Sequence, residues 1–325
     1  MSSNDEPLPA QLAKPAKAAI TKTKLIIFIF IPFFINVDTK IGSFADFFVT
    51  LPKFYLIRAY MKWIVLSDNR SCDRRLSTEH GLSVLLETEK HKILLDTGAS
   101  DVFIRNAEQM GIDFCDVDLV FISHGHSDHA GGLRYLLELN KQIRVIVSPD
   151  ALSGKFFSNR GHLHSITTDW PVLDDDRLLQ VSQTCEVVDD INVIAHIPQL
   201  HSLPKGNQYL YIEDAEGQLR LDDFRHELAL YVGGFLFTGC AHCGLENMLL
   251  ACPWPVHTVL GGFHLLDGKE TEGELKALAE RLKTNYPHTQ FYTSHCTGDR
   301  AFEVMKDVMG EQLLAFSLGM ITEKK

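Results

Sequence analysis

The sequence lacks several features that define other classes of protein. It has seven cysteines, an odd number, and their spacing shows no regular disulfide pattern. Both features argue against a secreted fold held by disulfides. No second Cys-x-x-Cys pair accompanies Cys240 and Cys243, so a zinc ribbon is excluded and a redox pair is the remaining alternative for this motif. The net charge of −11 argues against a general nucleic-acid binder, although a small phosphorylated substrate needs only a local positive pocket.

The sequence also lacks an apolar run long enough to span a bilayer, which takes about 20 residues. The run LIIFIFIPFFI, residues 25–35, is short, is interrupted by Pro32 and follows four lysines. Residues 1–60 therefore form a predicted leader with three interpretations: an over-extended start before Met61, a signal or anchor through residues 14–45, or an integral element. We expect a folded domain over residues 61–325 and a cytoplasmic protein without a membrane partner, with export or anchoring as the alternative.

From residue 61 onward, short apolar segments alternate with amphipathic ones. Helical periodicity predicts helices over residues 101–110, 129–139, 245–252, 271–283 and 301–309. Strands rich in Val, Ile, Leu and Phe are predicted over residues 63–66, 82–87, 92–95, 119–122, 143–147, 179–187, 191–197, 209–212, 228–232, 235–237, 257–260, 290–292 and 313–316. Neighbouring strand pairs are mixed with strand–helix–strand units, which favours an α/β (α+β) fold of layered sheets covered by helices.

A dense group of metal-ligand side chains follows one predicted buried strand. Residues 119–133 read LVFISHGHSDHAGGL, so the strand leads directly into His124, His126, Asp128 and His129. Alternation along the strand points His124 and His126 the same way, and Asp128 stands at the start of a helix, where a carboxylate is favoured. Imidazoles with a carboxylate suit zinc, iron or a similar ion. The order H-x-H-x-D-H predicts a metal site.

With this hexapeptide the sequence resembles the metallo-β-lactamase fold superfamily, from residue 61 to the C-terminus. The resemblance implies a catalytic domain built as a four-layer αββα sandwich, with two divalent metal ions at one edge. It assigns His124 and His126 to the first ion. It assigns Asp128 and His129 to the second. Zinc is the expected metal, and manganese and iron are the alternatives.

The resemblance also implies ligands at later strand ends. His242, in TGCAHCG, is the expected third ligand of the first ion, and His264, in GGFHLL, the last ligand of the second. His264 ranks above His295, which is instead expected to be a catalytic proton donor, an anion contact or a helix cap. Cys240 stands where many relatives carry a bridging Asp. Either its thiolate is a ligand or a small buried residue has replaced one.

Three further residues are expected to support or line the site. The resemblance gives Asp96, in LLDTG, the role of holding a ligand histidine by a hydrogen bond, and a simple strand-to-turn aspartate is the alternative. His80 and Asn69 are expected at the rim, where they could equally be structural. His226, just before a predicted strand, is the reserve ligand should His242 fail.

Several ordered motifs narrow the resemblance: EHGLSVLLE, ILLDTGA, TGCAHCG, GGFHL and SHCTG. They are similar to the branch that includes dihydropterin–ribofuranosylaminobenzene 5'-phosphate synthase. The expected function is a metal-dependent hydrolase or transferase that acts on a small phosphorylated or pterin-like substrate through a dinuclear site. Asp128 is expected to accept a proton as well as bind metal. A non-catalytic metal-binding sensor on the same fold is the alternative.

Overall fold

The computed structural model describes residues 60–324. The predicted leader, apart from Tyr60, lies outside the described residues, and so do the three interpretations of it. Within residues 60–324, no helix has both the length and the apolar character needed to cross a membrane.

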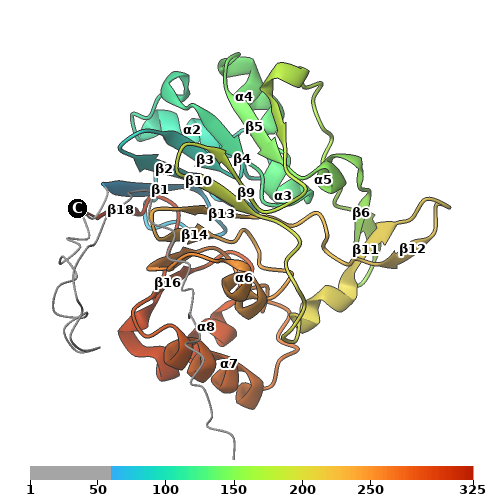
Figure 1. Cartoon of the computed structure of the whole chain (residues 1–325), viewed down its shortest axis with the longest axis vertical. Coiled ribbons are helices and arrows are strands. Elements are labelled where there is room, and N and C mark those ends of the chain that lie inside the picture. The colour runs from blue at the N-terminus through green and yellow to red at the C-terminus, as the bar shows by residue number, and fades with distance from the viewer. Residues whose placement is uncertain (1–59, 325) are drawn as a thin grey trace, which may run out of the picture. The chain divides into compact units, whose positions relative to one another are not determined.

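Two seven-stranded mixed sheets lie at the centre of the domain (Figure 1). The first contains β1 (Met61–Ser67), β2 (Ser83–Thr88), β3 (Lys92–Leu95), β4 (Leu119–Phe121), β5 (Arg144–Val147), β8 (Leu178–Gln180) and β18 (Ile321–Lys324), in the order β18-β1-β2-β3-β4-β5-β8. The second contains β9 (Cys185–Val188), β10 (Ile191–Ile194), β13 (Ala229–Val232), β14 (Phe235–Phe237), β15 (Thr258–Leu260), β16 (Gln290–Thr293) and β17 (Leu313–Ala315), in the order β17-β16-β15-β14-β13-β10-β9.

Helices cover the outer face of each sheet (Figure 1). The first sheet carries α2 (Val102–Gln109), α3 (Ser127–Ala130), α4 (Leu133–Leu139) and α5 (Pro149–Ser153), and the second carries α6 (Leu245–Ala251), α7 (Glu272–Asn285) and α8 (Asp299–Met309). Short 3₁₀ helices are Phe114–Asp116, Asp175–Arg177, Lys205–Tyr209 and Gly310–Gln312.

Alternation of side chains along the strands separates the layers. In β4, Val120 points outward into the apolar cluster under the helices, whereas Phe121 points inward and packs with Phe237 of the opposite sheet. Three apolar clusters result, one between the sheets and one under each helical layer. The predicted αββα sandwich is confirmed.

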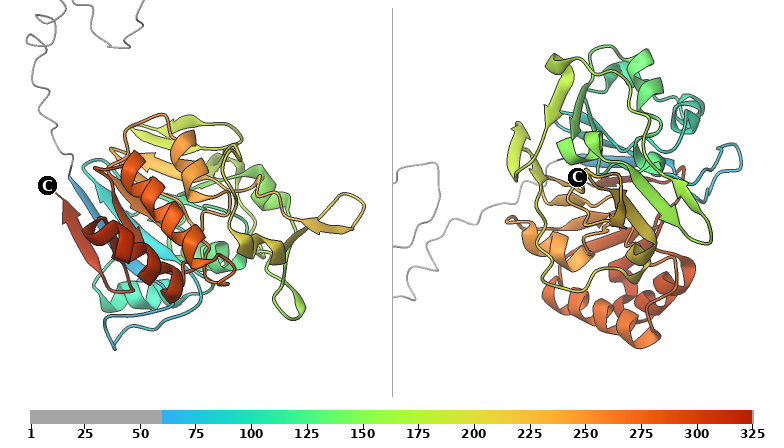
Figure 2. Two further views of the ribbon diagram at one scale, coloured as in Figure 1. Left: turned by 90° about the horizontal axis from the view of Figure 1, so that it is seen from below. Right: turned by 90° about the vertical axis from the view of Figure 1, so that its right-hand side faces the viewer.

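A third sheet was not predicted from the sequence. It has four strands in the order β12-β11-β6-β7: β6 (Phe156–Asn159), β7 (Leu163–Ser165), β11 (Leu210–Glu213) and β12 (Leu219–Leu221). Figure 2 shows its hairpins projecting from the sandwich. The edge strands β7 and β12 are exposed throughout, so they lack the apolar alternation that marks a half-buried strand. The predicted strand 179–187 is also wrong as one element, because β8 and β9 belong to different sheets.

The contact between the two sheets gives a direct test of the fold. Phe121 is fully buried, and its ring meets Phe237 edge to face with centroids 6.2 Å apart. Replacing Phe121 with alanine is expected to lower the free energy of unfolding by about 3–5 kcal/mol, because a cavity is left between the layers. Leu139→Ala is the control, since Leu139 is half exposed, and should change it by about 0.5 kcal/mol or less. Urea unfolding with an unchanged m-value measures both, and equal losses would contradict the packing.

Candidate metal centre

Loops at the carboxyl ends of parallel strands bring the predicted site residues together. β3, β4 and β5 are parallel in the first sheet, and β14, β15 and β16 are parallel in the second. The loops hold Asp96 after β3, His124 to His129 after β4, Cys240 and His242 after β14, His264 after β15, and His295 after β16. Because parallel strands end at the same edge, residues far apart in the sequence meet there.

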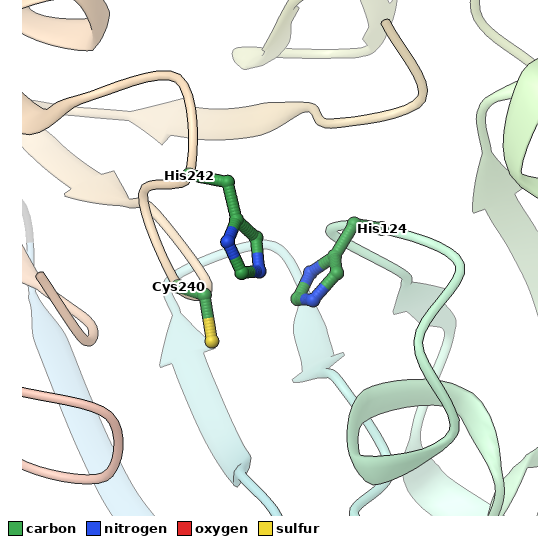
Figure 3. Close-up of side chains that lie close together, drawn as sticks. All are labelled: His124, Cys240 and His242. Atoms are coloured by element: carbon green, nitrogen blue, oxygen red, sulfur yellow. The ribbon is translucent and has the colours of Figure 1, made fainter. Parts of the chain in front are cut away.

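The first group of buried donor atoms consists of His124, Cys240 and His242. One ring nitrogen or sulfur of each lies within 4.8 Å of the others. Figure 3 shows the two imidazole side chains pointing toward each other from different loops, with Cys240 on the same loop as His242. His126 packs beside both, its ring centroid 4.6 Å from that of His124 and 4.9 Å from that of His242.

The second group consists of Asp128, His129 and His295. Asp128 Oδ2 lies 3.4 Å from His295 Nε2 and 3.7 Å from His129 Nε2. The two Nε2 atoms are themselves 3.2 Å apart. Cys240 Sγ lies 3.1 Å from His129 Nε2, so one thiol touches both groups.

His264 lies on the other side of Cys240 from the second group. Its ring packs on His242 with centroids 4.1 Å apart, and its Nε2 accepts from Arg160 Nη2 at 3.3 Å. His295 lies beside Asp128 and His129. One ring nitrogen of His264 lies within 4.8 Å of the sulfur atoms of Cys240 and Cys296, so both histidines stay candidate ligands. Loop length separates the two histidines: His295 stands two residues after β16, whereas His264 stands four residues after β15, beyond Gly261 and Gly262.

Four histidines are held through Nδ1, which leaves Nε2 turned toward the centre. The oxygens that accept from Nδ1 are Ser123 Oγ for His124 (2.9 Å), Asp96 Oδ2 for His129 (2.6 Å), Asn207 Oδ1 for His242 (3.3 Å) and Asn69 Oδ1 for His295 (3.0 Å). The hydroxyl of Ser123 donates to Asp96 Oδ2 at 2.7 Å, so it can only accept from His124. Such partners fix the tautomer of a metal-binding histidine.

The unsatisfied nitrogens test whether this donor set fits metal ions. His124 Nε2 and His242 Nε2 are buried and have no hydrogen-bond partner among residues 60–324. A buried lone pair without a partner is costly, and a coordinated cation would satisfy it. Imidazole, carboxylate and thiol together are donors that zinc accepts. The residues present therefore fit divalent metal ions.

Electrostatics favour the same conclusion. Burial and the neighbouring histidines hold the pKa of His124 and of His242 well below the usual value, so both rings are neutral, as metal binding requires. Burial would raise the pKa of Asp128, but His129, His295 and His80 hold it well below its usual range. Burial also opposes protonation of His129, yet Asp128 and Asp96 raise its pKa to about 9. This half of the site attracts positive charge.

The segment before β13 supplies supporting contacts, from His226, which the sequence offered as a reserve ligand, and from Asp222 and Glu227, which it did not reveal. His226 accepts from the Gly125 N–H through Nδ1 at 3.1 Å and meets Asp222 Oδ2 through Nε2 at 3.1 Å. Both its nitrogens are thus used, and it braces the His124–His126 loop instead of acting as the reserve ligand. Glu227 accepts the N–H groups of His242 and Cys243 at 2.8 and 2.6 Å. The sequence signal for these supporting residues is the segment DDFRHE, which places three acidic residues and a histidine just before the buried strand β13.

A cavity of about 470 Å³ opens over both groups. Its lining includes the metal-type residues His126, Asp128, Cys240 and His242, the polar residues His80, Ser158, Arg160, His164 and Asp267, and the apolar residues Ile166, Leu210 and Leu266. Arg160 pairs with Asp267, with Nε 2.9 Å from Oδ1. Arg160 and His164 come from the β6–β7 hairpin, so the unpredicted third sheet supplies one wall.

Comparison with known proteins agrees with this geometry. Residues 77–181 match the family model of the metallo-beta-lactamase superfamily. The chain carries a metallo-β-lactamase superfamily domain. The solved structure of Tm1679, a metal-dependent hydrolase of the beta-lactamase superfamily, superposes on this metallo-β-lactamase domain with a TM-score of 0.68 at 29% identity. The match covers 81% of this chain and 99% of that one.

Two curated relatives of this chain come from Methanocaldococcus jannaschii. The uncharacterized protein MJ0448 is 28% identical over 246 residues, which cover 73% of this chain and 91% of that protein. The 7,8-dihydropterin-6-methyl-4-(beta-D-ribofuranosyl)-aminobenzene-5'-phosphate synthase is 26% identical over 269 residues, which cover 75% of this chain and 90% of that protein.

The support that Asp96 gives to His129 can be tested by one substitution. Asp96→Asn should weaken zinc binding about 10- to 100-fold, because a neutral amide cannot replace the carboxylate that accepts from His129 Nδ1 and from two donors of Ser123. Asparagine tolerates the positive φ of 56° at this position, so the fold should persist. Competition with a chromophoric chelator measures the affinity.

The matched control for this test is Asp101→Asn, which removes an exposed carboxylate paired with Arg105 at 3.1 Å. Its zinc affinity should equal that of the unaltered protein. An Asp96→Asn protein that is folded and binds zinc with unchanged affinity would show that Asp96 does not support the metal centre.

Proposed function

We propose that this protein is a metal-dependent enzyme whose two divalent ions act on a small phosphorylated or pterin-like substrate. One observation carries the proposal: two buried donor groups share Cys240 Sγ at the floor of a cavity with an arginine in its wall. The similarity to Tm1679, a metal-dependent hydrolase, supports metal-dependent hydrolysis, and the name of the curated synthase supports a pterin-related substrate.

The proposed ligands divide between the two ions. His124, His126 and His242 would hold the first ion and Asp128, His129 and His295 the second, and the Cys240 sulfur lies within reach of both groups. Divalent ions at such a site polarise a phosphoryl, carbonyl or leaving-group oxygen and lower the pKa of bound water toward about 7. The chain's own residues fix the donors beforehand, since Asp96, Ser123 and Asn207 each hold a ring nitrogen that does not face the centre.

The cavity walls suit a substrate with an anionic group and a flat ring. Arg160 lies at the exposed rim of the cavity beside His264 and Ser158 and supplies local positive charge in a strongly acidic chain. Leu210, Ile166 and Leu266 give the cavity an apolar side on which a ring can pack. Asp267 neutralises Arg160 in the free protein, so we expect a substrate anion to take over part of that contact.

The molecule that attacks the substrate decides whether the enzyme is a hydrolase or a transferase. If water attacks the substrate, the enzyme is a hydrolase. If a second substrate attacks and a diphosphate leaves, the enzyme is a transferase. Protein purified without chelator should contain two metal ions per chain by mass spectrometry, and should turn over a phosphodiester such as bis(p-nitrophenyl) phosphate, a lactone, or a dihydropterin diphosphate with an aminobenzene phosphoriboside.

The outcomes of this experiment separate the two candidate functions. Pyrophosphate release that requires the second substrate would identify a transferase, and release without it a hydrolase. Fewer than one metal per chain with no turnover would remove the enzyme proposal. Two metals per chain with no turnover of any of these compounds would favour the metal-binding sensor.

The assignment of the last ligand has its own test in a pair of alanine variants. His295→Ala should reduce the metal content from two ions per chain to one, because the second group keeps only Asp128, His129 and the shared thiol. His264→Ala should retain both ions, since its Nε2 accepts from Arg160 and its ring belongs to neither proposed ligand group, although it lies near the sulfur atoms of Cys240 and Cys296. Metal analysis of both proteins, with circular dichroism to confirm folding, makes the comparison. Loss of metal in His264→Ala with full content in His295→Ala would support the order predicted from the sequence.

A further inference from the structure

Two histidines beside the second donor group are stacked and joined by one asparagine. The rings of His80 and His295 lie 5.1 Å apart at an angle of 24°. Asn69 reaches both: its Oδ1 lies 3.0 Å from His295 Nδ1, and its Nδ2 lies 3.2 Å from His80 Nδ1. The side-chain amide of Asn69 therefore contacts Nδ1 of each ring, and the two rings are nearly parallel.

The two ends of the amide impose opposite tautomers on the two rings. An amide oxygen only accepts and an amide NH₂ only donates. His295 must then carry its proton on Nδ1, which leaves the Nε2 lone pair facing Asp128 and His129. His80 must accept at Nδ1, so its proton is on Nε2. The reverse orientation of Asn69 would place a proton on His295 Nε2, where the proposed metal ion binds.

The position of His80 shows where this proton points. His80 Nε2 lies 3.4 Å from Asp128 Oδ2, and the residue lines the cavity. Its side chain is 62% exposed, whereas that of His295 is fully buried. The stacked pair thus divides its tasks: His295 turns a lone pair inward, and His80 presents an N–H to whatever occupies the cavity.

Contacts beside Asn69 hold its backbone in place. Ser294 Oγ donates to Asp68 Oδ2 at 2.8 Å, and Arg70 Nη2 donates to Ser294 Oγ at 3.3 Å. The two neighbours of Asn69 in the sequence, Asp68 and Arg70, therefore both hydrogen-bond to Ser294, the residue before His295. These contacts fix the backbone on both sides of Asn69 relative to His295.

Contacts on the His80 side are equally specific. Glu79 accepts from the Ala99 N–H and from Ser100 Oγ, at 3.1 and 2.6 Å. Gly81 lies so close to the hexapeptide loop that an added Cβ would stand 2.9 Å from Asp128 O. His80 is therefore fixed between an anchored carboxylate and a close backbone contact.

We propose that His80 is a neutral Nε2–H donor for an oxyanion of the substrate, such as a phosphoryl oxygen, and that Asn69 is the positioning residue that sets its tautomer. A fixed donor aimed at developing negative charge stabilises that charge without reorganisation. This inference rests on the proposed dinuclear metal site, because the orientation of Asn69 follows from a metal-binding lone pair on His295.

The tautomer can be observed directly by ¹⁵N NMR of histidine-labelled, zinc-loaded protein. The proton of His80 should be on Nε2 in the unaltered protein. In Asn69→Asp the carboxylate accepts from both rings, so the proton of His80 should move to Nδ1 while His295 keeps its own on Nδ1. Asn192→Asp, which adds the same charge at an exposed site, should leave both tautomers unchanged.

The donor role has a separate readout in the binding of inorganic phosphate to the zinc-loaded protein by calorimetry. His80→Phe keeps a ring on His295 without a donor and should weaken phosphate binding about tenfold or more. His80→Gln keeps an N–H and should stay within about threefold of the unaltered protein.

The outcomes distinguish this inference from the proposed function, because metal content is measured on the same samples. Two zinc ions per chain with the His80 proton on Nδ1, or with unchanged phosphate affinity in His80→Phe, would overturn the inference alone. A zinc content below two per chain would overturn the dinuclear site and this inference with it.

Discussion

The arrangement at the sheet edge depends on two ring nitrogens that face each other. His129 Nε2 and His295 Nε2 are 3.2 Å apart, and each ring is held through Nδ1 by an oxygen, from Asp96 and Asn69 respectively. Asp128 adds a carboxylate to the same point. Burial opposes protonation of His129, but Asp128 and Asp96 raise its pKa to about 9, so its Nε2 carries a proton near neutral pH and can donate it to His295 Nε2. A bound cation would take the place of that proton between the two nitrogens and the carboxylate.

Strained backbone at the strand ends makes this convergence possible. Asp96, Ala241, His264 and His295 all have φ between 50° and 56°, a region that costs a residue with a side chain about 1 kcal/mol or more. Each lies within a few residues of the end of a parallel strand, where a tight reversal directs the following side chains across the edge. Backbone hydrogen bonds across the loops hold these turns, for example from Thr97 N to His129 O at 2.7 Å and from Leu266 N to Cys296 O at 2.9 Å. The dense packing of the two sheets supports the same turns.

The sequence revealed the ligand cluster within one short segment, but it did not reveal which residues far apart in the chain meet. The hexapeptide places four ligand-type side chains within six residues, so its chemistry is readable without knowing the fold. The choice between His264 and His295 depends on how far each loop carries its histidine past a strand end, which no local pattern encodes. The pairing of Asn69 with His295 spans 226 positions, and its amide gains meaning only when the second ring, His80, is stacked beside it. The third sheet was not predicted because its exposed edge strands, β7 and β12, carry no alternation of apolar and polar residues.

Cys240 links the two halves of the proposed site and constrains its metal. Burial raises the pKa of its thiol well above the usual value, and the neighbouring Cys296 raises it further, whereas the adjacent His124 and His242 are already neutral. Loading the site therefore requires loss of a proton from the Cys240 sulfur and from His129, whose pKa is raised to about 9, but from neither His124 nor His242. A thiolate is a soft ligand that favours zinc or iron over manganese. At the position where the resemblance implies a carboxylate, this chain offers one sulfur atom within reach of both donor groups, so the same thiolate could serve either ion.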